Sequence, residues 1–250
     1  MSARLRRALG PLAAATLLAL AAGCASVPAA RVPAGPGGTA TLPRLDSTLF
    51  LAPPPAADSE LGRLELARVR EVRTGASAAR LAQAVSDNEL EPWTAFAAAL
   101  GRRVDPAAVP ANVALMARVR EEVLALGGAK DHYRRPRPFV ADPTLGSCLE
   151  DPAQRLRALN SWSYPSGHAT YGWTVALLLS ELLPERAGPI LDRGRDYGES
   201  RVVCGLHYPS DLDAGRLVGA ALVARLHGDS TFLAQLDRAR EELRRSLALH

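Results

Sequence analysis

Aromatic residues, lysine and cysteine are all scarce in this sequence of 250 residues. Phe, Trp and Tyr together make up 5%, which gives little support for the stacking surfaces that bind single-stranded nucleic acids. Hydrophobic residues at 48% and charged residues at 22% exclude a disordered chain. Lys130 is the only lysine, so arginine supplies almost all of the positive charge. After the first 24 residues, no apolar run is long enough to span a membrane.

The first 24 residues have the pattern of an export signal. Three arginines precede an apolar run over residues 8–22 that is too short for a permanent membrane helix. Small residues then precede Cys24, as in the lipobox of bacterial lipoproteins, where this thiol receives a lipid. Two outcomes stay open, namely lipidation of Cys24 or ordinary signal cleavage near Ala22. We expect a signal peptide over residues 1–23 and a lipid anchor at Cys24.

The leader also determines how the charge of the chain is interpreted. The formal net charge is +4, and removal of the leader's three arginines leaves +1. A nearly neutral mature chain gives no reason to expect a nucleic-acid partner. Ala25 after the cysteine, in place of Asp, resembles lipoproteins sorted to the outer membrane. We therefore predict a periplasmic protein of a bacterium, held at the outer membrane by its lipid.

The rest of the chain divides into a tether and one domain. Residues 24–58 are rich in Pro, Gly and Ala, a composition that disfavours helix and sheet, so they are predicted to be a tether. Over residues 59–250, apolar residues recur at helical spacing and strand alternation is nearly absent. The sequence therefore predicts a single all-α domain, a helical bundle. Helices are expected from about residue 60 and over residues 77–85, 92–101, 110–126, 168–183, 189–203, 209–226 and 230–249.

Two cysteines remain once Cys24 is set aside. An exported chain folds in an oxidising compartment, where an even pair of cysteines is a disulfide candidate. Cys148 and Cys204 allow only one pairing. The alternative is two buried thiols that never meet. We predict that these two cysteines form a disulfide.

Three short clusters contain residue types that bind an anion. The first runs over residues 130–138, is rich in cations, and contains two prolines that end any helix. In this cluster Lys130 and Arg137 are separated by six residues, and Arg137 precedes a proline. Taken alone, the cluster is equally compatible with a solvated basic loop.

The second cluster is Ser-Tyr-Pro-Ser-Gly-His over residues 163–168, directly before an apolar helical stretch. Ser166 is a good N-cap, and the free amides at a helix start favour anions. Gly167 and His168 follow this cap at the helix start. The structural alternative is a well-capped helix with a histidine in its first turn.

The third cluster covers residues 200–211 and contains Arg201, His207 and Asp211. Pro209 suits the first turn of a helix and puts His207 at its mouth. Asp211 follows His207 by four residues, close enough for its carboxylate to bond one imidazole nitrogen and fix the tautomer. A lone pair of this kind is more often structural than catalytic.

Together the spacings are Lys-x6-Arg-Pro, Pro-Ser-Gly-His and Ser-Arg-x5-His-x3-Asp, and eleven specified positions in this order are no accident of short motifs. The chain resembles the type 2 phosphatidic acid phosphatase superfamily, and most of all the bacterial class A non-specific acid phosphatases. Trp162 and Ala169 depart from the class A pattern, which has Gly and Thr at these places. Arg135 also precedes a proline, but only Arg137 gives the six-residue gap.

The resemblance implies hydrolysis of phosphomonoesters at acidic pH through a phosphohistidine, over a broad substrate range and without metal or cofactor. His207 would attack phosphorus, Asp211 would hold it, and His168 would protonate the leaving group. His168 would then start cationic and His207 neutral, which predicts an acidic pH optimum. The residues that would bind the phosphate oxygens are Lys130, Arg137, Ser166, Gly167 and Arg201. No His-Glu-x2-His or Cys-x2-Cys metal motif is present in the sequence.

Three other functions are compatible with the same anion site. A vanadium-dependent haloperoxidase shares the site, although such chains are usually much longer. A lipid phosphate phosphatase would use the same residues on a substrate that a membrane anchor keeps within reach. A non-enzymatic phosphate-binding lipoprotein would bind without turnover. Small phosphomonoesters are the expected partners, while the preferred one and the oligomeric state are left open by the sequence.

Overall fold

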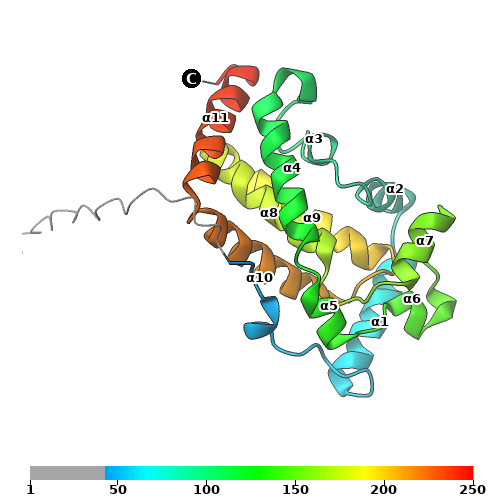
Figure 1. Ribbon diagram of the computed structural model, residues 1–250. Helices are drawn as coiled ribbons and strands as arrows, with labels where there is room; N and C mark the ends of the chain where they lie inside the picture. The colour runs from blue at the N-terminus through cyan, green and yellow to red at the C-terminus, as the bar shows by residue number, and fades with distance from the viewer. Residues whose placement is uncertain (1–42, 250) are drawn as a thin grey trace, which may run out of the picture. The chain divides into compact units, whose positions relative to one another are not determined.

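The computed structural model describes residues 43–249, and every regular element in this range is helical (Figure 1). This confirms the all-α fold predicted from the sequence. The α-helices are α1 (Glu60–Thr74), α2 (Ala78–Ser86), α3 (Pro92–Ala95), α4 (Pro110–Leu124), α5 (Gly128–Tyr133), α6 (Pro138–Ala141), α7 (Pro152–Leu159), α8 (Gly167–Leu182), α9 (Ala187–Val203), α10 (Pro209–Leu226) and α11 (Ser230–Ser246). Short 3-10 helices are η1 (Ser47–Leu49), η2 (Pro106–Ala108), η3 (Pro143–Leu145) and η4 (Pro184–Arg186). None of the helices in this range combines the length and hydrophobicity needed to cross a membrane.

The buried helix α8 is the centre of the domain. Its residues are apolar on almost every side, which is the pattern of a helix surrounded by others rather than one with a solvent-facing stripe. It packs against α9 and α10, and α4 and α11 pack against each other and against α8 (Figure 1). The core between these helices is mainly aliphatic, as the low aromatic content requires.

Two glycines let α10 approach the backbone of α8 closely. A Cβ atom on Gly215 would lie 2.7 Å from the carbonyl oxygen of Ser166, and one on Gly219 would lie 2.9 Å from that of Thr170. Close-packed interiors leave no room for such overlap, so any side chain at either position would push the two helices apart. The contact fixes the N-terminus of α8 against the first half of α10, and both segments carry predicted site residues.

Most of the predicted helices form within a few residues of their expected ends, and α10 has the predicted bounds. The stretch 92–101 differs, because α3 ends at Ala95 and turns follow it. The helices α5, α6 and α7 have no counterpart among the predicted ones. Each is eight residues or shorter, which is too short to display an amphipathic period.

The C-terminal part of the predicted tether belongs to the folded domain. Leu51 is buried, and its carbonyl oxygen accepts a hydrogen bond of 2.6 Å from the Tyr133 hydroxyl. The carbonyl oxygen of Ala52 accepts one of 2.7 Å from the Tyr164 hydroxyl. An extended Pro-rich backbone has free carbonyl groups, so tyrosine donors can fix it in place. The domain thus starts before residue 59, whereas the predicted signal peptide (1–23), Cys24 and the tether up to residue 42 lie outside the described residues.

Cys148 and Cys204 lie where a disulfide can form. Their sulfur atoms are within bonding distance and their Cα atoms are 4.8 Å apart, inside the usual range for disulfides. The Cys148 amide also donates a hydrogen bond of 3.2 Å to the Cys204 carbonyl oxygen. Because Cys204 caps the end of α9, the cross-link would tie this end to the segment before α7.

Loss of this cross-link is expected to lower the free energy of unfolding by about 4 kcal/mol, because it closes a loop of 56 residues in the unfolded chain. Urea unfolding of the protein and of the Cys148→Ser/Cys204→Ser double variant measures the difference. A reducing agent should lower the midpoint of the unsubstituted protein and leave that of the double variant unchanged. Equal midpoints for the unsubstituted protein with and without reductant would contradict the pairing.

Candidate active site

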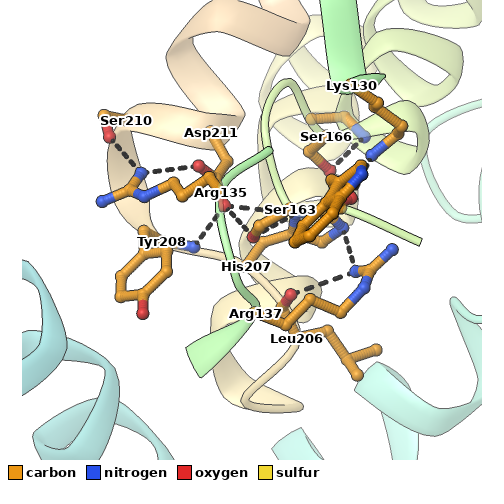
Figure 2. A network of polar contacts seen from close by, with 12 residues as sticks. Lys130, Arg135, Arg137, Ser163, Ser166, Leu206, His207, Tyr208, Ser210 and Asp211 are labelled. Atoms are coloured by element: carbon orange, nitrogen blue, oxygen red, sulfur yellow. Dashed lines mark hydrogen bonds and ion pairs between the residues drawn. The ribbon is translucent and has the colours of Figure 1, made fainter. Parts of the chain in front are cut away.

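The three clusters predicted from the sequence meet at the N-terminal end of α8 (Figure 2). The Ser163 amide donates a hydrogen bond of 2.8 Å to the Arg135 carbonyl oxygen, which joins the second cluster to the first. The Ser166 amide donates one of 3.0 Å to the Asp211 carbonyl oxygen, which joins the second to the third. Backbone hydrogen bonds thus bring together segments that are far apart along the chain.

The buried His207 is held between an arginine and a carboxylate (Figure 2). Its Nε2 lies 2.9 Å from Nη1 of Arg137, and its Nδ1 lies 3.3 Å from Oδ2 of Asp211. A guanidinium can only donate, so Nε2 accepts from Arg137 and the ring proton is on Nδ1, facing the carboxylate. Burial and the charge of Arg137 hold the pKa of His207 well below its usual value. The ring is therefore neutral, with a lone pair on Nε2.

The turn before His207 depends on a glycine. Gly205 has a φ of +70°, in the left-handed region that side chains disfavour. A Cβ atom there would also lie 2.9 Å from the Gly146 carbonyl oxygen. The turn ends α9 and leaves His207 two residues before Pro209, the first residue of α10.

The carboxylate of Asp211 connects the clusters through side chains as well. Its Oδ2 accepts hydrogen bonds from the Ser163 hydroxyl and, at 2.9 Å, from the Tyr208 amide. Its Oδ1 accepts one of 2.6 Å from Arg135. Although burial opposes ionisation, the hydrogen bond from His207, the charge of Arg135 and the hydrogen bond from Ser163 lower the pKa of Asp211 to about 2. The carboxylate is therefore ionised at neutral pH.

Arg135, which the motif spacing excluded, and Glu65, which no motif contains, are parts of the site. The Arg135 guanidinium is 7% exposed and lies 2.6 Å from Asp211 and 2.7 Å from Glu65. It also stacks 3.8 Å from the ring centre of Tyr208. Glu65 in turn accepts a hydrogen bond of 2.7 Å from the Ser210 amide at the start of α10. The one sequence feature that points to Glu65 is its helical spacing from the residues on the buried face of α1, where an acidic residue is unexpected.

Arg137 is oriented by backbone carbonyl groups. Its Nε lies 3.0 Å from the carbonyl oxygens of both Ala158 and Ser161, and its Nη1 donates to that of Leu206 at 3.1 Å. Burial and the charge of Arg201 lower the pKa of Arg137 to about 10, so it is charged at neutral pH. Because Nη1 also faces His207, Arg137 is placed to contact a group bound at Nε2.

Arg201 is fully buried and incompletely satisfied. Its Nη1 donates a hydrogen bond of 2.9 Å to Oδ1 of Asn88, and its Nη2 donates to the Ala84 carbonyl oxygen. Its Nε has no partner within residues 43–249. An unpaired buried donor costs about 1–3 kcal/mol, so an acceptor atom delivered by a ligand would stabilise it. Asn88, between α2 and α3, is a second residue that sequence motifs did not indicate.

His168 lies in the first turn of α8 and donates from Nε2 to the Asn88 carbonyl oxygen at 3.0 Å. Burial and the charge of Arg201 lower the pKa of His168 to about 3. The prediction that His168 is cationic at the start is therefore wrong for the protein alone. Lys130 and Arg137 add to this repulsion, and a like charge beside buried cations is unfavourable.

Lys130 is a further cation of the candidate site. Its Nζ donates a hydrogen bond of 2.7 Å to the Trp162 carbonyl oxygen. Burial and the charge of Arg137 lower the pKa of Lys130 to about 7. This single lysine is thus the cation of the site that can lose its charge near neutral pH.

The N-terminus of α8 adds neutral donors. Ser166 is its N-cap, and the hydroxyl oxygen accepts a hydrogen bond of 3.3 Å from the Ala169 amide. The amides of Gly167 and His168 have no acceptor within the helix, as at every helix start. A Cβ atom on Gly167 would meet nothing within 4 Å, so this side of the helix start is open.

A cleft of about 440 Å³ opens onto both histidines. We call it the polar cleft, because its lining includes the following polar side chains besides the histidines: Asn88, Glu89, Arg120, Arg137, Gln154, Arg157 and Ser161. No group of three or more His, Cys, Asp or Glu residues placed to hold a metal occurs among residues 43–249. The predicted independence from metals stays a prediction.

Comparison with known proteins identifies the family of this chain. It is 38% identical over 205 residues to the acid phosphatase of Zymomonas mobilis subsp. mobilis, which covers 80% of this chain and 76% of the relative. Its identity to the non-specific acid phosphatase of Providencia stuartii is 37% over 203 residues (79% and 81%). Its identity to that of Salmonella typhimurium is 35% over 208 residues (80% and 80%). Residues 110–232 match the model of the PAP2 superfamily. The chain belongs to the PAP2 superfamily.

The PAP2 match contains all three clusters, from Lys130 to Asp211. This confirms the resemblance inferred from their spacing. Glu65 and Asn88 lie outside the matched range, although α1 and the segment after α2 bring them to the site. The PAP2 motifs therefore describe only part of the cluster of polar groups.

Replacement of Arg135 by Met is expected to lower the free energy of unfolding by about 3–5 kcal/mol, because Glu65 and Asp211 would be left buried without their cation. The matched control is Arg118→Met. Arg118 likewise pairs with an acid and lies over a phenylalanine ring, but it is 23% exposed, and its partners Asp229 and Phe232 lie outside the clusters. Its loss should cost about 1 kcal/mol or less. Urea unfolding measures both values, and equal losses would contradict a special role for Arg135.

Proposed function

We propose that this PAP2 member is an acid phosphatase that hydrolyses phosphomonoesters through a phosphohistidine on His207. The observation that carries this proposal is the Nε2 lone pair of His207, which faces the Arg137 guanidinium while Asp211 holds the opposite nitrogen. The acid phosphatase names of the relatives support the same activity. We further propose a periplasmic location, an export signal with a lipid anchor at Cys24, and a broad substrate range.

Phosphate binding uses the charges of three side chains. The charge of Arg137 lowers the pKa of Lys130, and the charge of Arg201 lowers that of Arg137, so the three cations lie close enough to repel. A phosphate group among them would replace this repulsion with attraction, and it would present an oxygen to the unpaired Nε of Arg201. The amide of Gly167 and the hydroxyl of Ser166 add neutral donors at the helix N-terminus, which favours anions.

In the first chemical step, the bound phosphate takes over the hydrogen bond that Arg137 donates to Nε2 of His207. The freed lone pair of Nε2 attacks phosphorus, and the bond between phosphorus and the ester oxygen breaks. Asp211 stabilises the positive charge that develops on the ring. His168 gives a proton to the departing alkoxide from Nδ1, since its Nε2 is occupied by Asn88. The product alcohol leaves, and the phosphoryl group stays on His207.

In the second step, water hydrolyses the phosphohistidine. Neutral His168 accepts a proton from the water as its oxygen bonds to phosphorus, and the phosphorus–nitrogen bond breaks. The electron pair of that bond returns to Nε2 of His207. Inorganic phosphate then leaves, and the proton on His168 leaves with it or passes to solvent.

Because the pKa of His168 is lowered, the expected acidic pH optimum of activity needs another cause than a charged His168 in the free enzyme. With a pKa of about 3, His168 is neutral over most of the pH range of the protein alone. The proton for the leaving group therefore arrives with the substrate, as a phosphate monoanion that transfers it to His168 on binding. Since the second pKa of a phosphomonoester is about 6, the monoanion becomes scarce above this pH. The optimum is acidic because of the substrate's proton.

The two histidines are expected to respond differently to replacement. His207→Ala should lower kcat by at least about ten-thousand-fold with every substrate, because the nucleophile is lost. His168→Ala should lower kcat strongly with ethyl phosphate and much less with p-nitrophenyl phosphate, whose leaving group needs little protonation. Steady-state rates at pH 5 with both substrates measure the contrast.

The matched control is His227→Ala. His227 pairs with Glu181 at the C-terminal end of α8, whereas the clusters lie at the N-terminal end of this helix. The variant should keep wild-type rates. Alkaline quenching of the unsubstituted and the His207→Ala enzyme after mixing with labelled substrate detects the phosphoenzyme, because the phosphorus–nitrogen bond of a phosphohistidine survives alkali and is hydrolysed in acid. Label on the His207→Ala variant, or equal losses with the two substrates in His168→Ala, would contradict the assigned roles.

The pKa of about 7 at Lys130 predicts the shape of the alkaline limb. A cation whose pKa is lowered keeps its charge below that pKa and loses it as the pH rises. The logarithm of kcat/KM should therefore fall with a slope of about −1 above pH 6, from the substrate, and about −2 above pH 7, where Lys130 also loses its proton.

Lys130→Arg keeps the charge at all these pH values, although its planar group binds phosphate differently. Its maximal kcat/KM should be lower, but its slope should stay near −1 across the alkaline limb. The profile of both enzymes between pH 4 and 9 provides the measurement. An alkaline slope that steepens equally in the two enzymes would show that another group titrates there.

A further inference from the structure

A second cavity, of about 290 Å³, lies beside the polar cleft. It shares Leu90, Leu124 and His168 with that cleft and also reaches Lys130 and Gly167. We call it the apolar lobe, because the rest of its side-chain lining is almost entirely apolar: Val123, Leu126, Pro165, Thr170 and Val218. The lobe thus adjoins Lys130 and His168 of the candidate site, and its lining is more apolar than that of the polar cleft.

The position of the nucleophile decides which part of a substrate can enter the lobe. His207 lines the polar cleft but not the apolar lobe, whereas His168 lines both. In phosphoryl transfer the attacking and leaving atoms lie roughly in line on opposite sides of phosphorus. The leaving group therefore points away from His207, toward the side where His168, Gly167 and the lobe lie.

We propose that the apolar lobe binds the organic part of the substrate and gives this enzyme a preference for phosphomonoesters of apolar alcohols, aryl or arylalkyl. This inference rests on the proposed phosphatase function. A dry cavity of about 150 Å³ lined by aliphatic side chains holds a benzene ring, so the lobe has room for one ring with space to spare. Apolar pockets with a few convergent polar groups are the usual form of small-molecule sites.

Leu124 lines both the lobe and the polar cleft. It is the last residue of α4 and is 66% exposed. A bound apolar group would cover it. Polar alcohols such as sugars would instead be served by the polar cleft, where Asn88, Gln154 and Arg157 offer hydrogen bonds.

Two neighbouring glycines offer a matched pair of variants. Gly127 lines the lobe and has helical backbone angles, φ −66° and ψ −20°, so it accepts a side chain without strain. Gly128 is the first residue of α5 and does not line the lobe. A Cβ atom at either position meets nothing within 4 Å. Gly127→Leu thus fills the lobe, and Gly128→Leu adds the same side chain outside it.

The test compares benzyl phosphate with ethyl phosphate, which have similar alkoxide leaving groups but differ by an aromatic ring. We expect kcat/KM of the unsubstituted enzyme to be about 10-fold or more higher for benzyl phosphate. Gly127→Leu should lower this ratio by about 10-fold, and Gly128→Leu should leave it unchanged. Leu124→Gln, at an exposed helix end that tolerates substitution, should also lower the ratio.

Inhibition constants of benzylphosphonate and ethylphosphonate separate this proposal from the phosphatase function, because neither compound is hydrolysed. Absence of turnover with a preserved preference for benzylphosphonate would overturn the function and keep the binding site. Normal turnover with a kcat/KM ratio of benzyl to ethyl phosphate near one in the unsubstituted enzyme would overturn the proposed role of the lobe. It would fit a lobe that is occupied by another part of the chain or by another molecule. Equal changes in the two glycine variants would overturn it as well.

Discussion

The buried carboxylate of Asp211 is the interaction on which the rest of the site depends. Its two oxygens accept hydrogen bonds from His207, Ser163, Tyr208 and Arg135, and its backbone carbonyl accepts one from Ser166. A buried ion is tolerated only when its lone pairs are filled, so each of these donors is required to be where it is. One side chain at the start of α10 therefore fixes the tautomer of His207, the proposed nucleophile, and joins three segments of the chain (Figure 2).

This arrangement leaves an excess of positive charge that only a bound anion can balance. Arg135 is neutralised by Asp211 and Glu65, but Arg137, Arg201 and Lys130 have backbone carbonyl and amide oxygens as their main partners. Burial lowers the pKa values of these cations and of His168, and neutral oxygens, which satisfy hydrogen bonds without cancelling charge, leave the repulsion from neighbouring cations in place. The proposed affinity for phosphate and the neutrality of His168 both follow from this buried excess of positive charge.

The sequence predicts the helical fold because periodicity is a local property, and it predicts the convergence of the clusters because their spacing resembles that of a known superfamily. Arg135, Glu65 and Asn88 could not be predicted in the same way, since their roles arise only when α1 and the segment after α2 pack on the clusters. The protonation state of His168 was also beyond the motifs, because it depends on burial and on charges from three separate segments. The packing of residues 43–58 depends on two tyrosine hydroxyls whose targets no local pattern reveals.

The structure separates the chemistry from the choice of substrate. The groups around Asp211 sit on α8 and α10, whose close contact at Gly215 and Gly219 leaves no room for change. The apolar lobe is bounded by the end of α4 and the turn before α5, where Leu124 and Gly127 are exposed and few contacts constrain them. Substitutions in that turn can alter which alcohol is accepted without moving the nucleophile, because the hydrogen bonds that hold His207 come from other segments. If the clusters bind phosphate as proposed, the choice of substrate can change through the connection between α4 and α5 while the clusters stay as they are.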